Sequence, residues 1–191
     1  MNVTKIMTRP LKSSFFSCEK DAEEIIKRLF VTSQPYSNQL KRLLILNTKD
    51  CLDESNQNYS TIIQNTSVKE LVEKQYMTLV PRINIKEHEE IKSHIILSFE
   101  DFQETSNPEY RDCIVNFEIL CHAEVWNLGD YQVRPLKIAG IIDGLLNDTK
   151  LSGIGTLHFF SCDPLRLDET LLGYTLSFKA THGNDDNLPG L

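Results

Sequence analysis

Three acidic residues share one predicted strand and are the strongest candidates for metal-dependent chemistry. Asp112, Glu118 and Glu124 fall on alternate positions of this strand, so their side chains would share its exposed face. With Asp143, they could serve a small metal-dependent hydrolase or nuclease. Nucleases built on such a strand usually carry Glu-x-Lys, but no lysine stands two residues after Glu118. We therefore expect these acids to keep a half-exposed strand soluble, and we retain the hydrolase as the alternative.

Other short motifs carry weaker chemical signals. Gly153-Ile-Gly155 lacks the third glycine of a dinucleotide fingerprint and precedes a strand, so it predicts a turn with positive φ. His88 has no second histidine four residues later, and His94 lies on a strand pattern, so a solvated hairpin tip is favoured over a metal site. Cys121 and His122 are neighbours on a strand and point to opposite faces, which excludes a Cys–His dyad. We expect no catalytic residue, metal or cofactor, and no enzymatic activity.

Three residues are candidates for a protein interface. The single tryptophan, Trp126, ends the long strand, where it could cap the core or anchor an interface. Gly140 and Gly144 lie on the outer side of a predicted helix and leave a smooth groove there. Each glycine costs roughly 1 kcal/mol of helix propensity relative to alanine, and close approach of a neighbouring subunit would explain them. We predict self-association through this groove and the sheet edges.

Composition and charge restrict the function classes. The chain has 191 residues, 40% of them hydrophobic, which suits one globular domain. Its net charge of −7 argues against a protein that binds nucleic acid by neutralising phosphates. The charge is uneven, since residues 1–92 hold 14 basic and 12 acidic side chains and residues 93–191 hold 6 and 15. The second half therefore presents an acidic surface.

The cysteines and the apolar segments predict a soluble protein made in a cytoplasm. No segment approaches the roughly 18 uncharged apolar residues of a membrane span, and the start of the chain lacks the apolar core of a secretory signal. Five widely spaced cysteines form an odd set without a Cys-x-x-Cys motif. They predict reduced, buried thiols.

Residues 1–78 are predicted to form a helical elaboration at the N-terminal side of the core. An apolar stripe predicts an amphipathic helix over Cys18–Phe30. A capping box predicts a short helix over Ser67–Tyr76. Between them, Leu40–Leu46 fits a helix or a buried strand equally, and the polar segment Asn47–Asn65 predicts an exposed loop.

Residues 79–182 are predicted to form the sheet and helix core, followed by a loose tail over residues 183–191. Apolar residues there alternate with polar ones, which predicts strands. The fold class is α+β, a single domain with an antiparallel or mixed sheet of about five strands and helices packed on one face. The predicted elements are strands at Ile83–Ile85 and Ile95–Phe99 around a hairpin tip at Glu87–Lys92, a long strand at Tyr110–Trp126, a helix at Pro135–Asn147, and strands at Leu157–Phe159 and Tyr174–Ala180 joined by a loop at Pro164–Glu169.

Part of this pattern is shared with a known family. It consists of the strand Asp112–His122, Arg134-Pro135-Leu136, the helix Ile138–Asn147, Gly153-Ile-Gly155 and the closing strand Gly173–Phe178. In this arrangement, residues 111–181 resemble the tail-terminator and tail-completion proteins, which close the tail or neck of tailed bacteriophages. The segment before Arg111 is longer and more polar than it is in the compact family pattern.

The resemblance implies a structural virion protein without enzymatic activity. Such proteins form rings, commonly hexameric, that join the tail tube to the head and let DNA pass without specific binding. The implied partners are further copies of this chain, tail-tube proteins and head-connector proteins, with no membrane. The implied location is the virion, assembled in the host cytoplasm. A protein-binding adaptor outside any virion is a weaker alternative.

A ring in the head–tail channel would give the acidic second half a role. Acidic side chains in the lumen would repel DNA over about one Debye length, roughly 8 Å at physiological salt. We predict that part of one acidic set faces the channel. An acidic outer surface kept for solubility is the alternative reading. The set comprises Glu118 and Glu124 on the long strand and Asp163, Asp168 and Glu169 on the last loop.

Overall fold

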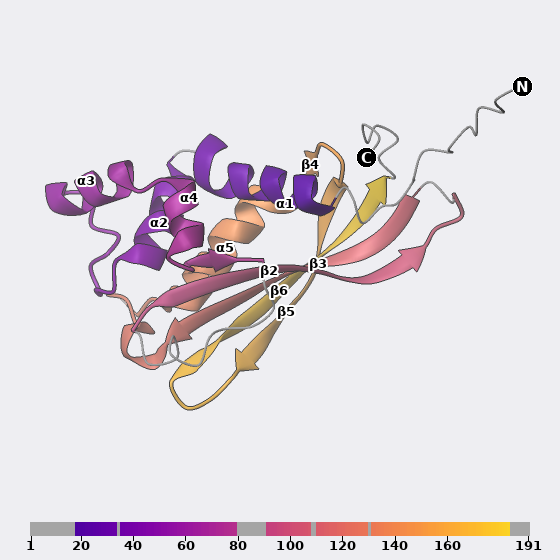
Figure 1. Ribbon diagram of the computed structural model, residues 1–191. Helices are drawn as coiled ribbons and strands as arrows, with labels where there is room; N and C mark the ends of the chain where they lie inside the picture. Colours follow the sequence, from indigo (N-terminus) through magenta and orange to yellow (C-terminus); the bar gives the residue numbers. More distant parts are fainter. Residues whose placement is uncertain (1–17, 34, 80–90, 108–109, 130, 184–191) are drawn as a thin grey trace, which may run out of the picture.

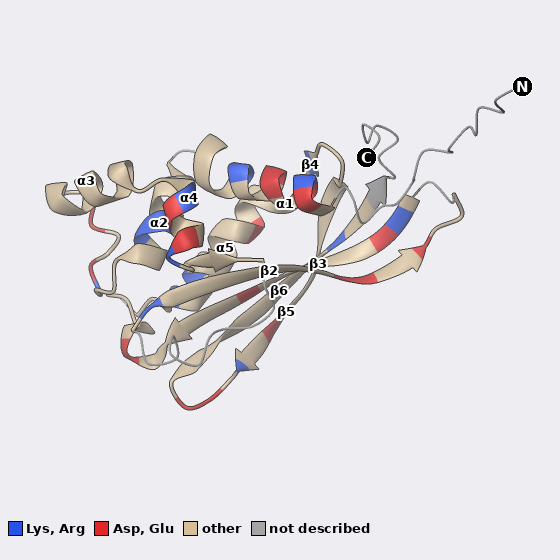
Figure 2. Ribbon diagram, viewed as in Figure 1, with Lys and Arg blue, Asp and Glu red and all other residues tan. Residues whose placement is uncertain are grey.

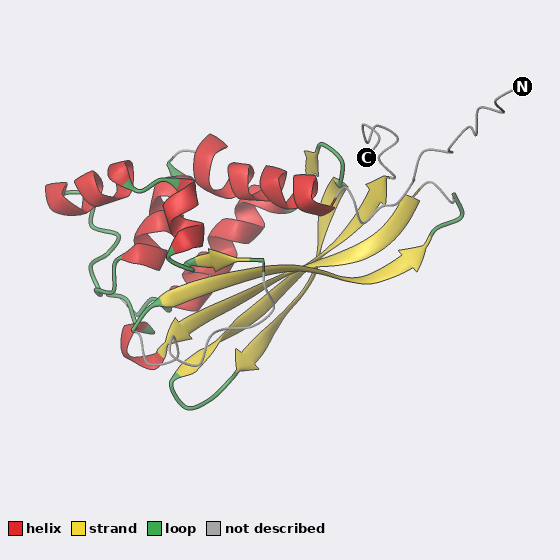
Figure 3. Cartoon of the chain, viewed as in Figure 1, coloured by secondary structure: helices red, strands yellow, loops and turns green. Residues whose placement is uncertain are grey.

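A twisted six-stranded sheet lies under a layer of helices (Figures 1 and 3). The computed structural model describes residues 18–33, 35–79, 91–107, 110–129 and 131–183. The strand order is β1-β2-β3-β6-β5-β4, and β1 and β2 form the parallel pair of an otherwise antiparallel sheet. The strands are β1 (Met77–Thr78), β2 (Ser93–Glu104), β3 (Tyr110–His122), β4 (Thr149–Leu151), β5 (Gly155–Arg166) and β6 (Leu171–Gly183).

The helices pack on one face of the sheet, so the predicted α+β architecture is confirmed, with six strands where about five were expected (Figure 3). Among the described residues, no helix is long and apolar enough to cross a membrane. The helical elements are α1 (Cys18–Lys27), the π-helical turn η2 (Arg28–Thr32), α2 (Tyr36–Ile45), α3 (Gln57–Asn65), α4 (Val68–Glu73), the 3-10 turn η4 (Ala123–Val125) and α5 (Arg134–Leu146).

The core forms where alternating strand residues meet the apolar stripes of the helices. On β3, Val115, Phe117 and Ile119 face the helices and are fully buried. The Phe117 ring meets Phe178 of β6 edge-on, with 5.9 Å between ring centroids. The predicted buried stripes of α1 and α5 are confirmed, and the ambiguous segment Leu40–Leu46 lies largely in α2.

Two N-terminal helices depart from or refine the sequence expectations. The prediction that Asn47–Asn65 is a loop is wrong from Gln57 onward, because α3 forms there. The Asn56 side-chain oxygen begins α3 by accepting the backbone N–H groups of Asn58 and Tyr59, at 3.1 and 3.3 Å. The capped helix predicted after Ser67 is confirmed as α4, since the Ser67 hydroxyl oxygen accepts the Glu70 N–H at 3.1 Å.

Several strand boundaries differ from the prediction. The long strand ends at His122 and not at Trp126, because the chain turns through η4. β5 runs through Pro164 to Arg166, so the connecting loop shortens to residues 167–170. β1 and β4 were not predicted, and the predicted strand at Ile83–Ile85, most of the hairpin tip and residues 184–191 lie outside the described residues.

No disulfide joins any of the five cysteines, all of which are described, but they are not all buried as expected. Cys51, Cys113 and Cys121 are buried, and burial raises the pKa of Cys113 to about 12 and of Cys121 to about 11. Cys162, on β5, is exposed. The prediction that every cysteine is buried is therefore wrong at Cys162, and Cys18 is only half-buried.

A buried arginine fixes α5 against α2. Arg134 is 0% exposed, and its guanidinium donates to four backbone carbonyl oxygens. The acceptors are Leu43 at 2.6 Å, Leu46 at 2.9 Å, Val125 at 2.7 Å and Thr48 at 2.7 Å. This single side chain thereby ties together the start of α5, the end of α2 and the turn that follows β3.

Candidate functional site

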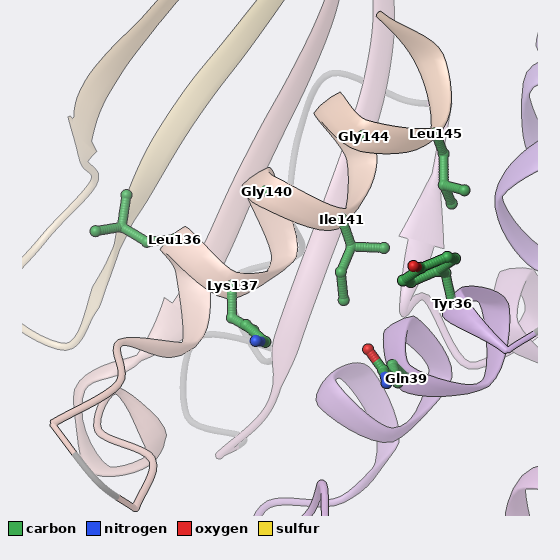
Figure 4. Close-up of a pocket in the computed structure, with 8 residues that line it drawn as sticks. All are labelled: Tyr36, Gln39, Leu136, Lys137, Gly140, Ile141, Gly144 and Leu145. Atoms are coloured by element: carbon green, nitrogen blue, oxygen red, sulfur yellow. The ribbon is translucent and has the colours of Figure 1, made fainter.

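A groove of about 390 Å³ runs between α2 and α5. Figure 4 shows Tyr36 and Gln39 of α2 on one side and Lys137, Ile141 and Leu145 of α5 on the other. The two walls are held at this spacing by the hydrogen bonds from Arg134 to the end of α2. The groove is thus a fixed feature of the helix layer, mostly apolar and open to solvent.

Gly140 and Gly144 both line this groove, on the outer side of α5, as the helical periodicity predicted. Both are exposed, and a Cβ atom at either position would meet nothing within 4 Å. The glycines are therefore not required by any contact that the described chain makes with itself. Their predicted role in contact between subunits stays a prediction.

Trp126 lies away from the groove. Its side chain is half-buried against the core, beside Tyr174 of β6, with 6.4 Å between the ring centroids. Its backbone carbonyl oxygen accepts the Arg134 N–H at 2.8 Å. The tryptophan thus caps one end of the core, and its predicted part in an interface stays untested.

The sheet face opposite the helices brings two of the predicted channel acids into one row. Glu118 of β3 and Asp163 of β5 both pair with Thr175 of β6, one from each side. Side chains in register share a face, so the two carboxylates flank Thr175 on the open face. Burial raises the pKa of Glu118, and the nearby carboxylate of Glu100 raises it further.

The other three predicted channel acids lie together at one end of the sheet. Glu124 is on η4, and Asp168 and Glu169 are on the loop between β5 and β6. The two segments are adjacent, because the Ala123 N–H donates to the Thr170 carbonyl oxygen at 2.7 Å. The hairpin tip between β5 and β6 is red with acidic residues in Figure 2.

The carboxylates of the hydrolase alternative are not brought together. Asp112 and Glu118 stand six residues apart on β3, about 20 Å at roughly 3.4 Å per residue. Asp143 is on α5, on the helix side of the sheet, and Asp112 accepts a hydrogen bond from the Thr181 hydroxyl at 2.7 Å. Within the described ranges, no three His, Cys, Asp or Glu residues are grouped to hold a metal ion.

The remaining motifs have structural roles where the chain is described. Gly153 and Gly155 have φ of +91° and +73°, which confirms the predicted turn. Cys121 points into the core, while His122 Nδ1 accepts the Glu124 N–H at 3.2 Å and so begins η4. His94 is buried, with Nδ1 3.0 Å from the Gln75 carbonyl oxygen, and His88 lies outside the described residues.

An exposed apolar margin along β5 was missed by sequence reasoning. β4 covers the edge of β5 only at Gly155–Leu157. Beyond it, Phe159 is 50% and Phe160 54% exposed, and Leu167 in the following loop is 47% exposed. The signal was the Phe159-Phe160 pair itself, because adjacent strand residues point to opposite faces and one core cannot bury both.

The comparisons with known proteins identify a family. The YomW family model matches residues 37–180, which is most of the chain and includes α2, α5 and the groove between them. YomW is a protein name from SPβ-like phages, so the match indicates a phage-associated protein and specifies no tail-terminator family. None of the curated proteins matches the sequence.

Proposed function

The chain belongs to the YomW family, and from this premise we propose that it is a structural subunit of a tailed-phage virion. It forms a ring, a tail terminator or neck ring, that joins the tail tube to the head and lets DNA pass. It acts by assembly and not by catalysis. The observation that carries the proposal is the open groove between α2 and α5, with two glycines that the described chain does not use.

The groove supports self-association because its two glycines lower the stability of α5. Two glycines in a 13-residue helix weaken α5 by roughly 1 kcal/mol each. Helices approach another chain most closely where glycine replaces a side chain, so a second subunit seated here would offset the loss. The groove is also apolar, as the contact regions of permanent assemblies are.

The open face of the sheet supports a wall that faces DNA. Its central row places Glu118 and Asp163 on either side of Thr175. The neighbouring row carries Asn116 and Ser177, whose side chains are hydrogen-bonded to each other at 2.6 Å. The Asn116 and Ser177 side chains are buried, so the groups of this face that would meet phosphates are the exposed Asp163 carboxylate and the half-buried Glu118 carboxylate, and both would repel them. We assign the channel wall to Glu118 and Asp163.

A groove variant tests the proposal. We expect the purified protein to form closed rings, commonly of six subunits, by light scattering and negative-stain imaging. Gly140→Leu should break these rings, because its side chain fills the groove, while circular dichroism and the melting temperature stay close to those of the wild type. Gly140→Ala is the matched control, since it adds a single methyl group.

Two outcomes would count against the proposal. Rings that survive Gly140→Leu unchanged would remove the groove from the interface. A wild-type protein that stays monomeric, alone and when mixed with tail tubes of its phage, would overturn the ring itself.

A further inference from the structure

We propose that the α2–α5 groove receives the tip of the β5–β6 hairpin of a second copy of this chain. Leu167 of the tip enters the groove, and Glu169 pairs with Lys137 at the rim. The inference rests on the proposed function, because it names the occupant of the groove in the ring.

The chemistry of the groove selects an apolar group with a negative charge beside it. Among the residues that line the groove, Lys137 is charged and the others are apolar or neutral. The Lys137 side chain is exposed and makes no ion pair with any described residue. A second cation lies near the far end, where Arg28 Nε donates to the Leu145 carbonyl oxygen at 3.2 Å.

The hairpin tip carries the complementary chemistry. Leu167 is 47% exposed, and Asp168 and Glu169 follow it directly. Glu169 is exposed and, like Lys137, makes no ion pair within the described chain. With Glu124 on the adjacent turn, the tip is an apolar side chain set among acids. Complementary charges of this kind fix the register of a contact and speed its formation.

The tip is held in shape before it binds. The Asp168 Oδ1 atom accepts the backbone N–H groups of Thr170 and Leu171, at 2.6 and 2.8 Å, and the Thr170 hydroxyl at 2.8 Å. A loop fixed by its own hydrogen bonds loses little conformational entropy on docking. Leu167 is therefore presented as a preformed projection.

The two surfaces lie on separate parts of the molecule. The groove is in the helix layer, whereas the tip of the β5–β6 hairpin lies at the lower corner of the sheet, below the helices in the view of Figure 1. One copy cannot fill its own groove with this tip. Because the two patches differ, the contact is head-to-tail, and repeated head-to-tail contacts close into rings when the rotation between copies allows it.

The free edge of β5 is less suited to the same contact. The strand is bulged between Phe159 and Ser161, and it contains Pro164, which has no N–H to donate. Bulges and prolines are the features that keep an edge strand from pairing with another strand. Docking through the side chains of the tip is favoured over extension of the sheet.

A charge swap tests the pairing. Lys137→Glu and Glu169→Lys should each weaken the association constant, measured by sedimentation at low salt, by about five-fold. The double variant restores the opposite charges and should recover association to within about two-fold of the wild type. Glu54→Lys, the same change on an exposed loop between α2 and α3, should leave association unaltered. Circular dichroism checks that each variant is folded.

The outcomes separate this inference from the function it rests on. Single variants without effect, or a double variant that stays as weak as the singles, would overturn the pairing. If Gly140→Leu breaks the rings while the charge swap fails, another segment fills the groove and the proposed function stands. A wild-type protein that does not assemble at all overturns both.

Discussion

Arg134 shows how a fully buried cation is held by backbone groups. Two of its four acceptors, the carbonyl oxygens of Leu43 and Leu46, come from the end of α2. Carbonyls in the last turn of a helix have no partner within the helix, and the helix dipole makes that end negative. The guanidinium therefore satisfies groups that would otherwise be buried without partners, and it joins two helices while doing so.

Replacing this arginine should destabilise the whole domain. Arg134→Met leaves four carbonyl oxygens without their donor, which costs about 3–5 kcal/mol. In a domain of this size, the melting temperature should fall by about 10 °C in calorimetry. Lys150→Met, an exposed lysine of β4, is the control and should change little. A drop of only a few degrees for the arginine variant would contradict the role described for it.

Glu118 should make the stability of the domain depend on pH. Burial, and then Glu100, raise its pKa above the ordinary value, so the folded protein holds this proton more tightly than the unfolded chain. Its contribution to stability is present at low pH and is lost as pH rises through the raised pKa. Glu118→Gln removes this dependence. The variant should gain in melting temperature relative to the wild type between about pH 4 and pH 7.

A matched control isolates this effect. Glu54→Gln removes a carboxylate on an exposed loop, and its difference from the wild type should stay constant over the same range. A Glu118→Gln difference that is equally constant would show that burial does not perturb this carboxylate.

At the scale of elements, strong periodicity made α1, α5 and β3 predictable. Their apolar residues recur at helical or alternating spacing, and each stripe is buried as expected. α3 was missed because it is mostly polar and buries Ile63 as its one fully buried residue. Its start depends on the Asn56 cap, a signal that is weak beside a run of Asn, Ser and Gln residues.

One wall of the candidate groove could be predicted and the other could not. Helical periodicity places Gly140 and Gly144 on the outer face of α5, and the structure confirms that placement. The facing wall of α2 depends on long-range contacts, above all the bonds from Arg134 to residues 43, 46 and 48. No local sequence pattern predicts which helix will form the wall of the groove that faces these glycines.

Replacing a glycine by alanine should have opposite effects on stability in β6 and in α5. At Gly173 of β6, a Cβ atom would collide with the Ile119 carbonyl oxygen of β3, so Gly173→Ala must push two paired strands apart. We expect a loss of about 3 kcal/mol or more in denaturant unfolding. Gly144→Ala in α5 meets nothing and should gain about 0.5–1 kcal/mol. Equal effects at both positions would be inconsistent with the packing.

On the scale of the whole molecule, the acidic second half is divided between two places. Glu118 and Asp163 lie on the open sheet face, and Glu124, Asp168 and Glu169 lie at the end of the sheet. The sequence shows which residues are acidic, but it does not predict this division into two groups. The division depends on the pairing of strands that are far apart in the chain. The two groups can therefore serve different contacts.

Reversing the charge of the open face should create a DNA-binding ring. Glu118→Lys with Asp163→Lys places new cations on the face assigned to the channel, and each phosphate contact adds a salt-dependent increment of affinity. Assembly should persist, while DNA ejection from virions that carry the variant should slow. The same two changes at Glu19 and Glu54 serve as the control. An unchanged ejection rate would place Glu118 and Asp163 outside the channel.

The position of β6 in the sheet also determines when the sheet can fold during synthesis of the chain. β6 is the last described strand in the chain, yet it lies between β3 and β5 and pairs with both. A nascent chain that has not yet released residues 171–183 from the ribosome holds two separate pieces of sheet with open edges. Folding therefore waits for the final strand. Incomplete chains, in which residues 167–170 are not yet held as a hairpin tip and the sheet is not yet continuous, are kept out of any growing ring.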